Sequence, residues 1–158
     1  MKRVVKQGST LFLKIVIYFI GAAVLALCIF ALPAGISSDK TGYYRPILIG
    51  MYIPAVPFFT ALYQSIKLLR YIDKNKVFSE LSVKALKNIK YCAVAICVLF
   101  GLGMPYIFYA ADRDDAPGVV LIGLVIIFAS IVIAAASGLF QSLLQNAVDI
   151  KSENDLTV

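Results

Sequence analysis

Apolar residues in this sequence are gathered into long runs, and charged residues interrupt them only at the ends. Four runs contain no Asp, Glu, Lys or Arg: residues 15–38, 46–66, 91–111 and 116–148. About 20 residues of α-helix cross a hydrocarbon core of roughly 30 Å, because the helix rises about 1.5 Å per residue. The pattern therefore predicts an all-α integral membrane protein with four transmembrane helices and no separate soluble domain.

Turn-forming residues beside the runs set the expected bounds of the spans. Pro33 and Gly35 are expected to end the first span, and Pro46 to begin the second, where a residue without an N–H fits the first helical turn. A cleaved signal peptide is the alternative for the first run, but such peptides have an apolar region of only about 7–15 residues. The spans are predicted at 11–32, 46–66, 91–111 and 119–144, within one domain of residues 1–158.

The long polar segment in the middle of the chain, residues 67–90, is predicted to connect two membrane hairpins. It carries seven of the fifteen Lys and Arg residues. A helix is expected to start after Ser79, a residue type that caps helix N-termini, and to continue into the third span. One face of this connector helix is expected to be apolar, with Leu81, Ala85 and Ile89 at helical spacing.

Composition supports the membrane assignment, and the distribution of charge gives an orientation. The chain is 61% hydrophobic, its mean hydropathy is +0.87 and its formal net charge is +6. Placing the N-terminus in the cytoplasm puts twelve Lys and Arg residues on that side and three on the other, in agreement with the positive-inside rule. Both termini, including the tail of residues 149–158, are therefore expected in the cytoplasm of a bacterium, with the spans in its cytoplasmic (inner) membrane.

The basic charge is expected to meet lipid rather than nucleic acid. Because the lysines flank membrane spans, direct nucleic-acid binding is not predicted. A lysine near an anionic headgroup contributes about 1 kcal/mol to membrane association. The connector lysines expected at the lipid headgroups are Lys84, Lys87 and Lys90; the alternative is that they serve topology and solubility alone.

Prolines and small residues in the spans indicate how the helices bend and pack. Each proline removes an intrahelical hydrogen bond, so a hinge or an ordinary kink is expected in the second span and an irregular outer end in the third. Small residues at helical spacing let helices approach closely, which favours a central position for the fourth span. The residues expected to set packing or act as hinges are Pro54, Pro57, Gly101, Gly103, Pro105, Ser130, Ala134 and Gly138.

Residue types that carry chemistry are scarce. The sequence has no His, and Lys14 is the one ionisable residue near the interior of a span. Proton-coupled carriers usually need a buried carboxylate or His, and the three cysteines form no CxxC pair. No nucleotide-binding glycine loop, paired carboxylates or metal-ligand cluster is present. The sequence therefore predicts a protein that is not an enzyme and has no catalytic residues, cofactor or metal.

Two segments resemble a known family. They are Asn75–Ala93 (NKVFSELSVKALKNIKYCA) and Leu144–Val158 (LQNAVDIKSENDLTV), and they are similar to signatures of the small bacterial four-span membrane proteins of domain of unknown function family 2975. The matching positions are Phe78, Ser79, Leu86 and Lys87 in the connector and Glu153, Asp155, Leu156 and Val158 in the tail.

The resemblance implies a partner but no established activity. Proteins of this kind are often encoded beside a small helix-turn-helix regulator, which suggests a noncatalytic membrane protein that senses a membrane or small-molecule signal and sequesters or regulates that transcription factor. A disordered tail that binds nothing is the alternative. The residues expected to bind the partner are Phe78, Ser79, Lys84, Lys87, Glu153, Asp155, Leu156 and Val158.

A different class of function is also consistent with the sequence. A small transport, permeation or immunity protein could act on a lipid-like or peptide substrate at a cavity rimmed by outer aromatic residues. A pore needs a continuous polar path, whereas the spans contain only scattered Tyr, Ser, Thr and Gln. A homo-oligomer would weaken that objection, so the oligomeric state stays open. The residues expected at the rim are Tyr43, Tyr44, Tyr106 and Tyr109.

Overall fold

The computed structural model describes the backbone of residues 2–157 and the side chains of residues 8–157. All regular structure in this range is helical. In chain order the helices are α1 (Lys2–Ala26), the π-helical turn η1 (Leu27–Ala31), α2 (Leu32–Ser38), α3 (Arg45–Gly50), α4 (Tyr52–Asp73), α5 (Glu80–Arg113) and α6 (Pro117–Leu156).

Four stretches of helix are long and apolar enough to cross a membrane. They are Gly8–Ser38, Arg45–Asp73, Glu80–Arg113 and Pro117–Leu156. The prediction of an all-α membrane protein with four spans is therefore confirmed. A helix begins directly after Ser79 and continues through the third span, as the sequence predicted. α4 extends to Asp73, so residues 74–79 are the part of the connector that lies outside a helix.

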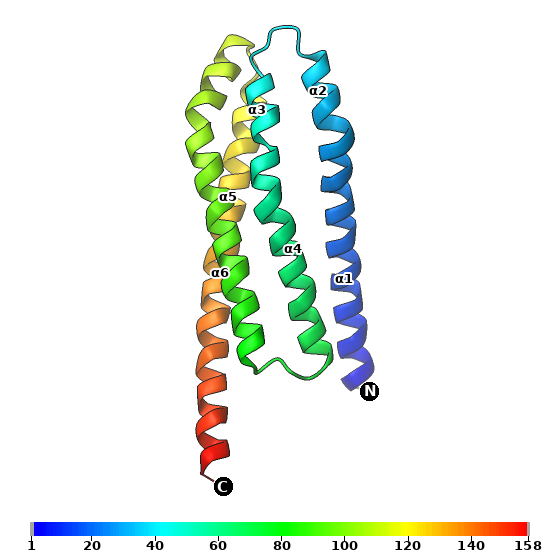
Figure 1. Cartoon of the computed structure of the whole chain (residues 1–158), viewed down its shortest axis with the longest axis vertical. Helices are drawn as coiled ribbons and strands as arrows, with labels where there is room; N and C mark the ends of the chain where they lie inside the picture. The colour runs from blue at the N-terminus through cyan, green and yellow to red at the C-terminus, as the bar shows by residue number, and fades with distance from the viewer. Residues whose placement is uncertain (1, 158) are drawn as a thin grey trace.

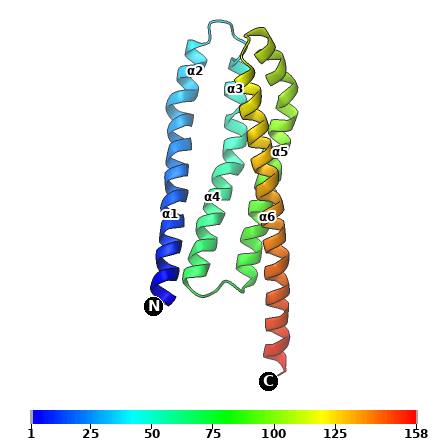
Figure 2. The same cartoon turned by 180° about the vertical axis from the view of Figure 1, so that it is seen from behind.

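The spans lie side by side in chain order. α1 packs against α4, α4 against α5, and α5 against α6 (Figures 1 and 2). The start of α1 and the end of α6 lie at the same end as residues 74–79, which we call the terminus end, and the loops 39–44 and 114–116 lie at the opposite, loop end (Figure 1). The last turns of α6 extend beyond the other helices at the terminus end.

The helix at the centre of this arrangement is α5, not α6 as the sequence predicted. α5 contacts α3, α4 and α6 and contains most of the buried residues. The small residues of α6 do pack closely, since Ser130 and Ser137 are buried and the Lys90 side chain lies along Gly138. They face one neighbour, α5, so close packing along one strip does not make α6 central.

The first span continues through Pro33 instead of ending there. The helix takes up the proline in the π-helical turn η1, where the Leu32 N–H donates to the Leu27 carbonyl five residues back. In that register the missing Pro33 N–H would have bonded to the Cys28 carbonyl. The Tyr52 hydroxyl donates to this carbonyl at 2.9 Å. A side chain of the second span thus replaces the bond that the proline removes.

The second span is divided at Met51, between α3 and α4. Pro54 has no N–H to donate to the Gly50 carbonyl four residues before it, which explains why the helix breaks there. Pro57 lies within α4, and the helix continues through it.

The third span is a regular helix to its loop end, so the expected irregularity around Gly101, Gly103 and Pro105 is absent. These residues lie inside α5, which is continuous for 34 residues. Pro105 removes a single hydrogen bond, and the remaining helical bonds hold the segment together.

The start of α5 also differs from expectation in the face that it buries. Ser82, Leu86 and Ile89 are buried, whereas Leu81 is 53% exposed. Because α5 is packed between α4 and α6, its buried face is wide and centred away from Leu81. Ala85 and Ile89, the other two residues of the predicted apolar face, are buried as expected.

The loop between α2 and α3 is organised by Asp39. Its carboxylate accepts hydrogen bonds from the backbone N–H groups of Thr41, Gly42, Tyr44 and Arg45 at 3.0–3.1 Å. Desolvation of the carboxyl acts to raise its pKa, but these bonds and one from the Thr41 hydroxyl outweigh it, so the pKa of Asp39 lies below its ordinary value. Asp39 thereby ties the end of the first span to the start of the second.

Candidate functional site

A hollow at the terminus end joins the connector to the extension of α6. Its volume is about 700 Å³. Phe78, which comes from the connector, is 56% exposed, and Ile150 of α6 is 67% exposed. We call it the terminus-end hollow; it is lined by Phe78, Ala147, Ile150, Lys151, Glu153, Asn154 and Thr157.

The hollow brings together residues from both segments that resemble the family. Phe78 and Glu153, expected in a partner site, line the same hollow although 75 positions separate them in the sequence. Lys151 and Glu153 also line the hollow, so charges of both signs accompany the apolar Phe78 and Ile150. An exposed apolar centre with a polar rim is typical of a surface that binds another protein.

Two serines fix the turn that carries Phe78. Ser79 occupies the N-cap position of α5, but its hydroxyl makes no cap bond and donates instead to the Lys76 carbonyl at 2.8 Å. The hydroxyl of Ser82, a fully buried residue, donates to the same carbonyl at 3.1 Å. The expected side-chain cap is therefore wrong, because the hydroxyl of Ser79 serves the preceding turn. Both bonds join a residue after Phe78 to the carbonyl of Lys76 before it, so they hold the turn that contains Phe78.

The connector lysines differ in their surroundings. Lys84 and Lys87 are exposed, and the Lys87 ammonium lies 6.0 Å from the centre of the Tyr91 ring. The Lys90 side chain packs along Gly138 of α6, so its aliphatic part contributes to helix packing. The assignment of all three lysines to lipid headgroups stays a prediction.

The tail continues α6 as helix through Leu156. Asp155 and Leu156 are exposed, Leu156 by 84%, but neither lines the terminus-end hollow. Val158, also expected to bind the partner, lies outside the described residues. Of the three expected tail residues that the structure describes, only Glu153 lines the hollow.

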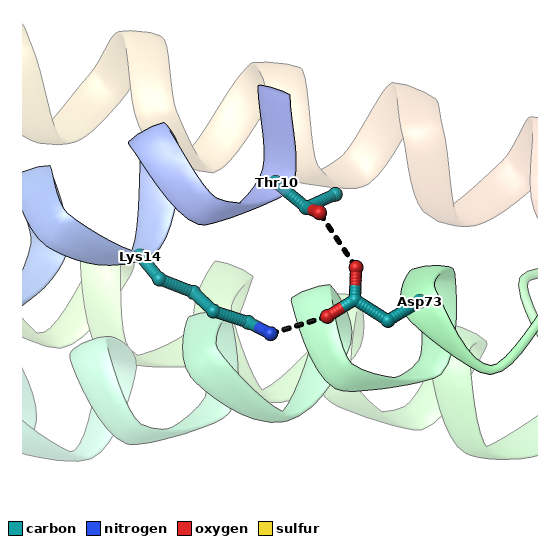
Figure 3. A network of polar contacts seen from close by, with 3 residues as sticks. All are labelled: Thr10, Lys14 and Asp73. Carbon is teal, nitrogen blue, oxygen red and sulfur yellow. Dashed lines mark hydrogen bonds and ion pairs between the residues drawn. The ribbon is translucent and has the colours of Figure 1, made fainter. Parts of the chain in front are cut away.

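A polar contact between the first two spans escaped the sequence analysis. The Lys14 ammonium forms an ion pair with the Asp73 carboxylate at the end of α4, and the Thr10 hydroxyl donates to the other carboxylate oxygen at 2.6 Å (Figure 3). The side chains of Lys14 and Asp73 are 24% and 27% exposed. Lys14 lies about one turn inside the predicted first span, which starts at residue 11, and in an antiparallel pair of spans this level faces the end of the second span. That relation could have been read from the sequence.

A second, mainly apolar hollow lies between α3, the start of α4 and α5, in the half of the spans nearer the loop end. Its volume is about 270 Å³. We call it the span hollow. Pro54 and Gly103 line it as two of the expected hinge or packing residues, whereas Pro57, Gly101 and Pro105 do not. Its lining is Pro46, Ile47, Gly50, Met51, Ile53, Pro54, Leu99, Phe100, Gly103, Tyr106 and Ile107.

Three of the four expected rim tyrosines form a cluster beside the span hollow. The rings of Tyr43 and Tyr109 meet edge to face at 6.4 Å, and those of Tyr106 and Tyr109 lie 6.1 Å apart. The Tyr106 hydroxyl donates to the Tyr43 carbonyl at 3.2 Å, and the Arg113 guanidinium lies 5.3 Å from the Tyr109 ring. Tyr106 is the one that lines the hollow.

Tyr44 has a different environment from the other three tyrosines. Its hydroxyl is buried and has no hydrogen-bond partner among the described residues. Desolvation raises the pKa of Tyr44, and the negative charges of Asp114 and Asp39 raise it further. The Asp114 carboxylate lies near the hydroxyl without meeting hydrogen-bond geometry.

Comparisons with known proteins agree with the architecture. The chain is 56% identical over 156 residues to the uncharacterized membrane protein YoaS of Bacillus subtilis (strain 168), a match that covers 95% of this chain and 98% of the relative. No solved structure matches the chain. The model of the family described as protein of unknown function (DUF2975) matches residues 28–158, which include both hollows. The chain therefore belongs to the DUF2975 family.

Proposed function

We propose that this protein is a noncatalytic regulator in the bacterial cytoplasmic membrane, with its terminus end in the cytoplasm. It senses a membrane or small-molecule signal and holds or releases a small helix-turn-helix transcription factor. The observation that carries the proposal is the terminus-end hollow, where the connector and the extension of α6 form one surface.

The chemistry of this surface supports protein binding. Phe78 and Ile150 are large, exposed apolar side chains. Phe78 belongs to the connector and Ile150 to α6, whose last turns extend beyond the other helices (Figure 1). Covering such a side chain stabilises a complex by about 1.5–3 kcal/mol. Lys151 and Glu153 at the rim supply charges that select a partner and set its orientation.

The packing of the spans provides a route from the membrane to this surface. α4 ends at Asp73, the residue that ties it to α1, and the connector that carries Phe78 follows directly. A signal that favours a different arrangement of α4 would move the connector relative to α6. Release of the partner then requires only that the signal bind one arrangement better than the other.

Affinity capture from native membranes tests the proposal. The full-length protein is compared with Phe78→Ala and with Leu81→Ala, a matched control whose side chain is similarly exposed but does not line the hollow. Truncating a central apolar contact at an interface costs about 2 kcal/mol or more, which corresponds to roughly 30-fold weaker binding. We expect mass spectrometry to identify a helix-turn-helix protein with the full chain and Leu81→Ala but not with Phe78→Ala. Equal capture by all three proteins would reject the site.

One observation favours a second candidate function, that of a small transport, permeation or immunity protein for a lipid-like or peptide substrate. The span hollow lies beside the cluster of Tyr43, Tyr106 and Tyr109, where the aromatic rings could receive such a substrate. Flux of lipid-like and peptide probes across liposomes that contain the purified protein, compared with empty liposomes, tests this function. Equal flux in both preparations would exclude it.

A further inference from the structure

The span hollow has an opening for a ligand because two glycines line it. Gly50 of α3 and Gly103 of α5 carry no side chain, and a Cβ atom built on either would meet nothing within 4 Å. The resulting volume of about 270 Å³ is close to the lower limit of roughly 300 Å³ for small-molecule pockets. The remaining lining is mostly aliphatic, which suits an apolar ligand.

Two prolines give this apolar hollow a specific polar character. Pro54 and Pro57 have no N–H, so the carbonyls of Gly50 and Ile53 lack their regular helical donors four residues later. Gly50 and Ile53 both line the hollow. Within the hydrocarbon core no bulk water is available to replace the missing bonds. The hollow therefore combines an apolar wall with backbone carbonyls whose regular helical donors are missing.

The hydroxyl that lines the hollow is already engaged. The Tyr106 hydroxyl donates a hydrogen bond to the carbonyl of Tyr43. All lining residues belong to the two spans Arg45–Asp73 and Glu80–Arg113, so a ligand would enter from the membrane. An ordinary acyl chain would fill the space but has no donor for the carbonyls.

We propose that the span hollow binds a lipophilic molecule with an apolar body and one hydroxyl or N–H donor. The apolar part lies against α5 near Leu99 and Phe100, and the donor bonds to a carbonyl at the junction of α3 and α4. That the molecule is the signal of the regulator rests on the proposed function; the binding site itself does not. Occupancy of the junction would change how α4 is held against α5.

Photolabelling of the full-length protein in liposomes tests the site. The probe is a medium-chain primary alcohol that carries a diazirine, and its methyl ether serves as the analogue without a donor. We expect saturable labelling of the part of α5 that contains Leu99 and Phe100, with competition by unlabelled decanol. Loss of one neutral hydrogen bond should weaken the ether about 3- to 10-fold. Labelling that does not saturate, or is equal for alcohol and ether, would overturn the proposal.

A pair of glycine variants locates the site. Gly103→Phe fills the hollow, whereas Gly101→Phe places the same side chain on the same helix at a position that does not line it. We expect Gly103→Phe to lose saturable labelling and Gly101→Phe to keep it, and retention in both variants would contradict the assignment. If both substitutions prevent folding, the comparison of alcohol and ether on the unaltered protein decides the question.

Partner capture in the presence of decanol separates this proposal from the proposed function. Saturable labelling with no change in captured protein would leave the ligand site established and reject its role as the signal. Partner capture that persists while the probe fails to bind would support the regulator and reject the ligand site.

Discussion

The ion pair between Lys14 and Asp73 should hold α1 against α4 at the terminus end. Two unit charges about 4 Å apart attract by about 4 kcal/mol at an effective dielectric constant near 20. Ordering and desolvation of the side chains offset much of this attraction. Because the two side chains are 24% and 27% exposed, we expect a net coupling of about 1–2 kcal/mol, between the values for surface and buried pairs.

The perturbation is Asp73→Asn, which removes the charge but keeps an oxygen that can accept the Thr10 hydroxyl. We expect the free energy of unfolding to fall by about 1.5–3 kcal/mol, the range for a hydrogen bond to a charged group, because Lys14 loses its counterion. Lys14→Met removes the other charge and keeps an apolar stem. In the double variant the two losses should not add, since the ammonium that would be left unpaired is gone.

Reversible unfolding in mixed detergent micelles, followed by circular dichroism, measures all four proteins of this cycle. Lys84→Met is the control, because Lys84 is an exposed lysine of α5 and its loss should change the free energy of unfolding by less than about 0.5 kcal/mol. A coupling energy below about 0.5 kcal/mol would refute the view that the pair fastens α1 to α4.

Three further predictions concern local packing and hydrogen bonding. The folded-state pKa of Asp39 is lowered. The carboxylate therefore stabilises the fold above the unfolded-state pKa of about 3.9, and this stabilisation is lost as pH falls through the folded-state pKa. Asp39→Asn should lower the Tm at pH 7, and the difference in Tm between the variant and the unaltered protein should shrink in acid. Tyr52→Phe should lower the free energy of unfolding by about 0.6–1.7 kcal/mol in the membrane. The loss should be smaller in a Pro33→Ala background, where the backbone N–H is restored, and equal losses in both backgrounds would contradict the account of the π-helical turn. A Cβ at Gly123 would lie 2.9 Å from the Met104 sulfur, whereas one at Gly138 would lie 3.6 Å from its nearest neighbour. Gly123→Ala should therefore destabilise the protein by about 1 kcal/mol, and Gly138→Ala should leave the free energy of unfolding unchanged in the same unfolding assay.

The number and class of the spans followed from the sequence, but their neighbours did not. Long runs of apolar residues identify a helix that crosses a membrane, because the bilayer requires them whatever the helix contacts. Apolar residues face lipid and protein alike, so the pattern could not show that α5 is central and that α6 packs along it. The π-helical turn at Pro33 was also missed, since it depends on the hydroxyl of Tyr52 in another span.

The candidate sites show the same division. The charge distribution placed the connector and tail on one side, and the resemblance indicated Phe78 and Glu153. That the two residues line one hollow depends on α6 continuing as a helix through Leu156, whereas the predicted fourth span ended at residue 144. Predicting the ion pair of Lys14 and Asp73 required the alignment of two antiparallel helices, and hydropathy defines such an alignment to within one helical turn at best.

Photocrosslinking in living cells from position 78 tests the central claim most directly. A photoreactive amino acid replaces Phe78 in one strain and Phe128, a strongly exposed residue within the fourth span, in another. The account predicts a crosslinked complex with a small helix-turn-helix protein from position 78 and none from position 128. Adducts with lipid alone from both positions would contradict the proposal that the terminus-end hollow holds a regulator.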